Sequence, residues 1–206
     1  MILNIQGDVL IKCLIPKYSG FCFGVLLVVQ AAYENINNRT YILGNIVHNP
    51  SVISDLKSKG LRFVHFIEEI SEENAKVLIR AHGVPKKTVI ELNQRVFEII
   101  DKTCSRVKNA HEIVMDASSR GFDIIVIGTP NHSEIIGIMG WSNTRTVLLH
   151  DMDDTKRIIH NIRFFEKGVC LVAQTVHVET AAEINISALK GVENLVISSG
   201  ALTPKN

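Results

Sequence analysis

Three short stretches of the sequence place thiol, imidazole and carboxyl groups where chemistry is commonly done. They are residues 19–25 with Cys22, residues 101–104 with Cys104, and residues 131–134 with His132 and Glu134. Each stretch follows an apolar run typical of a strand and opens a run typical of a helix. In an open α/β sheet, ligands bind at the carboxyl ends of the strands. We therefore expect these side chains to lie at one reaction centre.

The two cysteines in these stretches differ from the other two in the chain. Cys22 and Cys104 each stand just before a predicted helix, whose N-terminus attracts negative charge. Cys13 and Cys170 lie inside apolar runs, where a free cysteine packs as a small hydrophobic residue. The first pair therefore predicts a thiolate-held metal or cluster. Two kinds remain open, an iron–sulfur cluster or a hydrolytic zinc site that also uses a histidine.

Three of the eight histidines follow predicted strands at the same sheet edge, namely His48, His82 and His132. Imidazoles, helix N-termini and the hydroxyl of Thr175 suit a diphosphate. Glu134 follows His132 by two residues and is a candidate proton donor at the same site. The alternative is a carboxylate in the first turn of a helix that only the helix dipole favours. The other five are interpreted as solvated or hydrogen-bonded side chains: His65, His111, His150, His160 and His177.

Composition excludes several classes of protein. With 22 Lys+Arg against 21 Asp+Glu, the net charge of +1 argues against binding to nucleic acid or a membrane surface through bulk charge. The four cysteines lack a C-x-x-C spacing and do not form a disulfide framework in a chain of this length. No secretory signal, membrane-spanning stretch or nucleotide-binding glycine loop is found. We therefore expect a soluble cytoplasmic protein.

Strand-like and helix-like runs alternate along the chain, which predicts parallel sheets covered by helices on both faces. The expected fold is α/β, with two similar domains at residues 1–103 and 104–206. Strands are predicted at residues 11–15, 40–47, 76–80, 96–101, 122–127, 145–149, 169–173 and 195–197. Helices are predicted at residues 24–37, 51–59 (capped by Ser51), 86–95, 105–120 and 178–189.

Six motifs in order resemble the LytB family, the 4-hydroxy-3-methylbut-2-enyl diphosphate reductases of non-mevalonate isoprenoid biosynthesis. The motifs are GFCFGV at 20–25, IVHN at 46–49, AHGV at 81–84, DKTC at 101–104, NHSE at 131–134 with Gly137 and Gly140-Trp141, and AQT at 173–175.

The resemblance implies a function for each candidate residue. Cys22 and Cys104 would be thiolate ligands of a [4Fe–4S] cluster. His48, His82 and His132 would hold the diphosphate of an allylic substrate, and Glu134 and Thr175 would form the proton-delivery side. Ferredoxin or flavodoxin would supply electrons, and the products would be isopentenyl and dimethylallyl diphosphate.

The sequence also departs from the family pattern. The family uses a third cysteine after the Gln-Thr motif and a third α/β domain, whereas no cysteine follows Cys170 here. Ser105 and Ser133 stand where the family commonly has proline. We therefore expect two lobes of a three-lobed reductase. Three explanations stay open, which are a natural short form, a split enzyme completed by a separate third-domain polypeptide, and a truncated reading frame. The alternative is an inactive two-domain fragment that binds a diphosphate or a partner chain.

Overall fold

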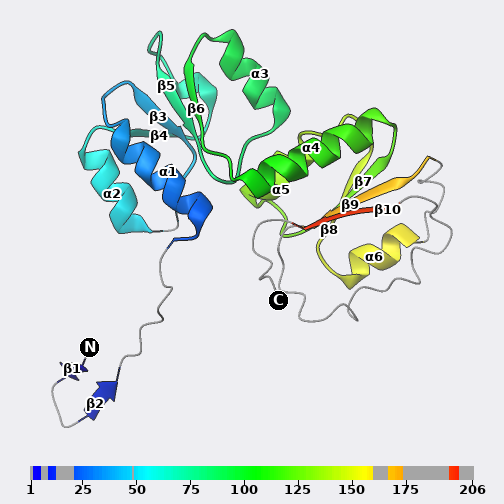
Figure 1. The fold of residues 1–206 in the computed structure, drawn as a ribbon, viewed down its shortest axis with the longest axis horizontal. Coiled ribbons are helices and arrows are strands. Elements are labelled where there is room, and N and C mark those ends of the chain that lie inside the picture. The colour runs from blue at the N-terminus through cyan, green and yellow to red at the C-terminus, as the bar shows by residue number, and fades with distance from the viewer. Residues whose placement is uncertain are drawn as a thin grey trace.

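The structure of the 206-residue chain is a computed structural model that describes residues 2–5, 9–12, 21–47, 49–159, 167–173 and 195–199. Two parallel four-stranded sheets dominate it (Figure 1). The strands are β1 (Ile2–Ile5), β2 (Val9–Lys12), β3 (Thr40–Leu43), β4 (Arg62–Val64), β5 (Lys76–Ile79), β6 (Glu98–Asp101), β7 (Asp123–Ile127), β8 (Thr146–Leu149), β9 (Val169–Ala173) and β10 (Leu195–Ser199). The helices are α1 (Phe23–Glu34), α2 (Pro50–Ser58), the 3₁₀ turn η1 (Ile67–Glu69), α3 (Lys86–Gln94), α4 (Ser105–Ser119), α5 (Ser133–Met139) and α6 (Met152–Ile159).

The first lobe contains the sheet β4-β3-β5-β6 with helices α1, α2 and α3. Side chains alternate along its strands, so that Ile42 and Leu78 face α1 and α2 while Tyr41 and Val77 face α3 and η1. All four residues of β3 are buried. Apolar residues on both faces of a strand are what a parallel sheet between two helical layers requires.

The second lobe contains the sheet β10-β9-β7-β8 with helices α4, α5 and α6. One face of β7, through Ile124 and Val126, packs against α4 and α5. The opposite face, through Ile125, belongs to a smaller cluster that includes Ile158 of α6. This lobe is therefore also a sheet between two helical layers, as the apolar run at residues 122–127 predicts.

The two lobes share one strand order. In each, the first strand is central, the second lies at the edge beside it, and the third and fourth follow on the other side. In the first lobe α2 leaves β3 toward one face of the sheet and α3 leaves β5 toward the other. A ligand site is expected where such connections diverge, at the carboxyl ends of these strands. The prediction of two similar parallel-sheet α/β lobes is confirmed.

Local differences from the predicted elements have simple physical reasons. The side chain of Asn49, not Ser51, caps α2 by accepting hydrogen bonds from two backbone N–H groups, so this helix begins at Pro50. The strands β1 and β4 and the helix α6 were not predicted from the sequence. The N-terminal strand predicted at residues 11–15 is β2, which pairs antiparallel with β1. The helix predicted at residues 178–189 lies outside the described residues.

Candidate functional site

The two candidate cysteines begin helices that meet. Cys22 is the N-cap residue of α1 and Cys104 is the N-cap residue of α4, and neither side chain caps its own helix. Cys22 is exposed, and Cys104 is half-buried. A methyl group placed on Gly24 would lie 3.2 Å from Sγ of Cys104. Only glycine therefore lets the start of α1 approach this thiol so closely, and both helix N-termini turn their positive ends toward the same region.

The loop that carries Cys104 is held from both sides. One oxygen of Asp101 accepts hydrogen bonds from the backbone N–H and the hydroxyl of Thr103, at 2.8 and 2.5 Å. The other oxygen lies 2.6 Å from Nζ of Lys108. Burial opposes the charge of Asp101, but the hydrogen bonds from Lys108 and Thr103 outweigh it and lower the pKa of the carboxyl. The conformation of residues 101–104 thus comes from an ionised Asp101.

Two candidate histidines from different lobes touch. His82 follows β5 and His132 caps α5, and their ring centroids lie 5.5 Å apart in a T-shaped arrangement. Nδ1 of His132 accepts the backbone N–H of Glu134 at 3.2 Å, so the proton of a neutral ring is carried by Nε2. The backbone N–H of Cys104 donates to the carbonyl of Ala81 at 2.9 Å. Thiol and imidazoles thus belong to one cluster of loops.

Glu134 lies in the first turn of α5, two residues after His132. Its side chain is partly buried, and this burial raises the pKa of the carboxyl above its ordinary value. A carboxyl group that keeps its proton to higher pH is better suited to act as an acid. Dipole stabilisation and proton donation, the two interpretations that the sequence left open, are thus both compatible with this position.

His111 was interpreted from the sequence as an ordinary solvated or hydrogen-bonded side chain, and this is wrong. It lies in α4, is only 5% exposed, and stacks on Trp141 with ring centroids 5.0 Å apart. Its Nε2 has no hydrogen-bond partner among the described residues. Burial lowers the pKa of His111 to about 4, although the nearby charge of Asp101 opposes this change. No local sequence signal could identify this residue, because its surroundings come from both lobes.

The buried imidazole predicts a pH-dependent stability. The unfolded chain takes up a proton at His111 near pH 6.5, whereas the folded chain does so only near pH 4. The folded state therefore has its full stability with respect to this residue above pH 6.5. It loses stability as the pH falls from 6.5 toward 4, because the unfolded chain binds the proton first. We expect the free energy of unfolding to fall by about 2 kcal/mol from this residue between pH 8 and pH 5. Urea titrations of the parent and of His111→Gln at both pH values measure it, and equal pH dependence in the two proteins would contradict it.

Arg80 is a further charged residue at this sheet edge, and it was not considered in the sequence analysis. A methyl group on Gly44 would lie 2.7 Å from Cζ of Arg80, so the guanidinium packs on the Gly44 backbone, where φ is +77°. Its Nη1 donates to the carbonyl of Asn45 at 3.1 Å. Burial lowers the pKa of Arg80, and no described carboxylate forms an ion pair with it. The guanidinium of Arg80 therefore stabilises the loop after β3 and adds positive charge beside the carboxyl end of β5.

Two predicted site residues, His48 and Thr175, lie outside the described residues, as does Cys13, which was predicted to be a core residue. Cys170 is fully buried in β9, in agreement with its interpretation as a core residue, and burial raises the pKa of its thiol. Within the described part of the chain, no three His, Cys, Asp or Glu side chains gather in a set that could hold a metal ion. None of the described helices is long and apolar enough to cross a membrane.

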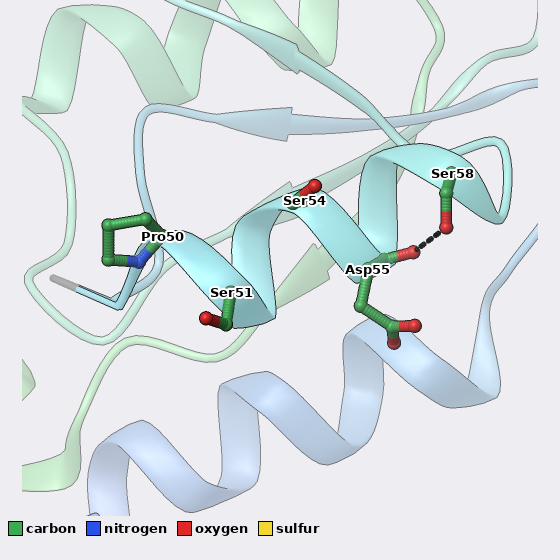
Figure 2. Close-up of a pocket in the computed structure, with 5 residues that line it drawn as sticks. All are labelled: Pro50, Ser51, Ser54, Asp55 and Ser58. Carbon is green, nitrogen blue, oxygen red and sulfur yellow. Dashed lines mark hydrogen bonds between the residues drawn. The ribbon is translucent and has the colours of Figure 1, made fainter.

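A hollow along α2 offers no chemistry comparable to that of these loops. Figure 2 shows its lining residues, which are Pro50, Ser51, Ser54, Asp55 and Ser58. The carboxylate of Asp55 already accepts the hydroxyl of Tyr33 at 2.7 Å and the ammonium of Lys59 at 2.6 Å. We therefore assign no function to this hollow.

An apolar surface borders Cys22, as expected for lobes that pack against a further domain. Phe23 at the start of α1 is 73% exposed, and Leu26 and Leu27 are exposed on the next turn. Phe21 extends the surface on the other side of Cys22. Contiguous exposed apolar side chains of this kind mark interaction surfaces.

The comparisons with known proteins agree on one family. The family model described as LytB protein matches residues 13–177. A 4-hydroxy-3-methylbut-2-enyl diphosphate reductase of Caldanaerobacter subterraneus is 38% identical over 185 residues, covering 87% of this chain and 62% of that protein. The chain thus spans about six-tenths of that relative. A reductase of the same name from Trichlorobacter lovleyi is 26% identical over 264 aligned positions, more than this chain has residues, so part of it has no counterpart here.

Solved structures give the same result. The structure of an (E)-4-hydroxy-3-methyl-but-2-enyl diphosphate reductase, described as the terminal enzyme of the non-mevalonate pathway, matches with a TM-score of 0.71 and 28% identity. The match covers 89% of this chain and 65% of that one. The corresponding reductase from Plasmodium falciparum matches with a TM-score of 0.72 and 25% identity, over 83% of this chain and 54% of that one.

Proposed function

We propose, because this chain belongs to the LytB protein family, that it forms two lobes of a 4-hydroxy-3-methylbut-2-enyl diphosphate reductase in isoprenoid biosynthesis. The observation that carries the proposal is the contact between His82 and His132. This contact joins the two lobes, here assigned to residues 1–103 and 104–206. It lies next to the loop of Cys104, whose backbone N–H donates to the carbonyl of Ala81. The substrate is an allylic diphosphate, and the products are isopentenyl and dimethylallyl diphosphate.

His82 and His132 are proposed to bind the diphosphate, together with His48 and Thr175. Two imidazoles in contact suit an anion, because each ring can donate a hydrogen bond to a phosphate oxygen and becomes a stronger donor when protonated. Arg80 adds positive charge at the same sheet edge. Glu134 is proposed as the proton donor, since burial keeps its carboxyl protonated to higher pH. An inactive binding fragment is less favoured, because binding alone needs no buried acid.

Cys22 and Cys104 fit two of the thiolate positions of a [4Fe–4S] cluster. They stand at the N-termini of adjoining helices, which favour negative charge, and Gly24 lets the start of α1 approach Cys104 closely because it has no side chain. Such a cluster, when bound, would pass electrons to the substrate one at a time. Cys170 does not fit as a third ligand, because it is buried within β9.

The partners follow from the same proposal. A third domain would supply a further thiolate and cover the apolar surface of Phe21, Phe23, Leu26 and Leu27. Ferredoxin or flavodoxin would supply electrons in the cytoplasm. The near-neutral charge of the chain leaves no reason to propose nucleic acid or a membrane as a partner.

Anaerobic reconstitution tests the proposed function. The chain is loaded with iron and sulfide and assayed with 4-hydroxy-3-methylbut-2-enyl diphosphate and a reduced ferredoxin. The assay is repeated after adding the part of the Caldanaerobacter reductase that has no counterpart in this chain. We expect slow turnover alone and a large increase with the added polypeptide. Absence of both substrate binding and turnover in the combined sample would refute the proposal.

The histidine assignment predicts a loss of affinity for inorganic diphosphate. His82→Ala or His132→Ala should each cost about 1.5–3 kcal/mol of binding free energy, about 10- to 150-fold, because a hydrogen bond to a charged group is lost. Isothermal titration calorimetry measures the dissociation constants. His65→Ala is the control, because His65 is exposed in the loop after β4. Parent-like affinity in both site variants would show that the anion binds elsewhere.

A further inference from the structure

The lobes meet at a joint where glycines of the second lobe lie against the backbone of the first. A methyl group on Gly137 of α5 would lie 3.3 Å from the carbonyl oxygen of His82. A methyl group on Gly140 would lie 2.5 Å from Cβ of Pro85. The carbonyl of Gly140 also accepts the backbone N–H of Lys86 at 3.3 Å. These short distances fix the position of the turn that contains His82 and Gly83, here called the His82 turn, relative to α5. His132 is the N-cap residue of α5.

His111 and Trp141 fill the joint from within the second lobe. A methyl group on Gly83 would lie 2.7 Å from Cε1 of His111, and one on Gly137 would lie 3.4 Å from Nε2 of the same ring. The imidazole therefore lies against both glycines, one from each lobe. Its other neighbour is the stacked indole of Trp141, whose Nε1 donates to the carbonyl of Val84 at 2.9 Å. Because His111 is buried and the half-buried Trp141 is hydrogen-bonded across the joint, the imidazole has little room to shift.

We propose that His111, held by Trp141, is a positioning residue that sets the spacing between His82 and His132. The ring contacts the glycine that follows His82 and the helix that His132 caps, so it supports both histidines. A displacement of the His82 turn would change the separation of the two imidazoles directly. The effect on diphosphate binding rests on the proposed function, whereas the effect on ring spacing does not.

Gly137→Ala tests the inference with little risk to the fold. Alanine favours a helix more than glycine does, so α5 itself is not weakened. The added methyl group would lie 3.3 Å from the His82 carbonyl oxygen and in ordinary contact with the His111 ring at 3.4 Å, so the His82 turn has to yield by a few tenths of an ångström. We expect the nuclear Overhauser effect between the ring protons of His82 and His132 to weaken, measured in protein whose histidines carry ¹H on an otherwise deuterated background. We also expect diphosphate affinity to fall about tenfold, because binding geometry is sensitive to small displacements.

His111→Ala tests the same inference by removing the support. It should weaken the same Overhauser effect and diphosphate affinity, and Asn109→Ala, an exposed change on α4, should alter neither. If His111→Ala does not fold, Gly137→Ala decides alone. An unchanged Overhauser effect in the folded variants would overturn the inference. If the parent does not bind diphosphate, the proposed function fails. The Overhauser effect between His82 and His132 in the variants still shows whether His111 sets the spacing.

Discussion

Replacing Cys22 and Cys104 together by serine is expected to reduce bound iron and sulfide to the background level. A serine hydroxyl stays protonated at neutral pH and cannot replace a thiolate ligand. The two cysteines are the N-cap residues of α1 and α4, and Gly24 lies against Cys104. Removing both thiols therefore leaves the described part of the chain without a thiolate donor beside these helix N-termini. Iron and sulfide are counted per chain after anaerobic reconstitution, with the added third-domain polypeptide present.

Cys170→Ala is the matched control for this experiment. Cys170 is fully buried in β9 and packs in the core with Val172, so its loss should alter stability and leave iron loading unchanged. Single serine variants at Cys22 and Cys104 should each lose most of the iron. Parent-like iron content in the double variant would remove both residues from the cluster assignment.

Gly83→Ala is expected to lower the free energy of unfolding by about 2–5 kcal/mol, because two penalties add. Gly83 has a φ of +70°, in the left-handed region where an alanine is strained by about 1–2 kcal/mol. In addition, the new methyl group would lie 2.7 Å from Cε1 of His111 and 3.0 Å from Cγ2 of Thr103. Overpacking of this kind costs about 1–3 kcal/mol. Urea unfolding at pH 7.5 measures the loss.

Gly60→Ala separates the two penalties. Gly60 has a φ of +100°, and a methyl group there meets no atom within 4 Å. This variant should therefore show only the backbone strain of about 1–2 kcal/mol. The difference between the two variants reports the contact of Gly83 with His111 across the joint. Equal losses would show that this contact does not resist an added methyl group.

The sequence predicted the framework of the fold because the framework depends on local patterns. Strands such as β7 and β9 are short apolar runs, and α4 is a long periodic run that ends before Gly121. The unpredicted elements lack these patterns. The strand β4 has three residues, begins with the exposed Arg62, and lies at a sheet edge. The start of α2 was placed one residue late because Asn49 provides the cap.

The sequence also indicated which side chains gather at the carboxyl ends of the strands. A residue that follows a parallel strand lies at a known edge of the sheet, so Cys104 and His82 were expected near each other, and the hydrogen bond from Cys104 to Ala81 joins their loops. The family motifs pointed to the same residues. That part of the candidate site needs only the order of strands and loops along the chain.

Only the tertiary structure decided how the lobes meet. The contact of His82 with His132, the burial of His111 on Trp141, and the approach of Gly137 to the His82 carbonyl each join segments distant in the sequence. The low pKa of His111 is one consequence, because it depends on the loss of water around the ring rather than on neighbouring sequence. A local pattern specifies which face of an element is buried, whereas the partner it is buried against, and therefore its chemistry, is set by packing.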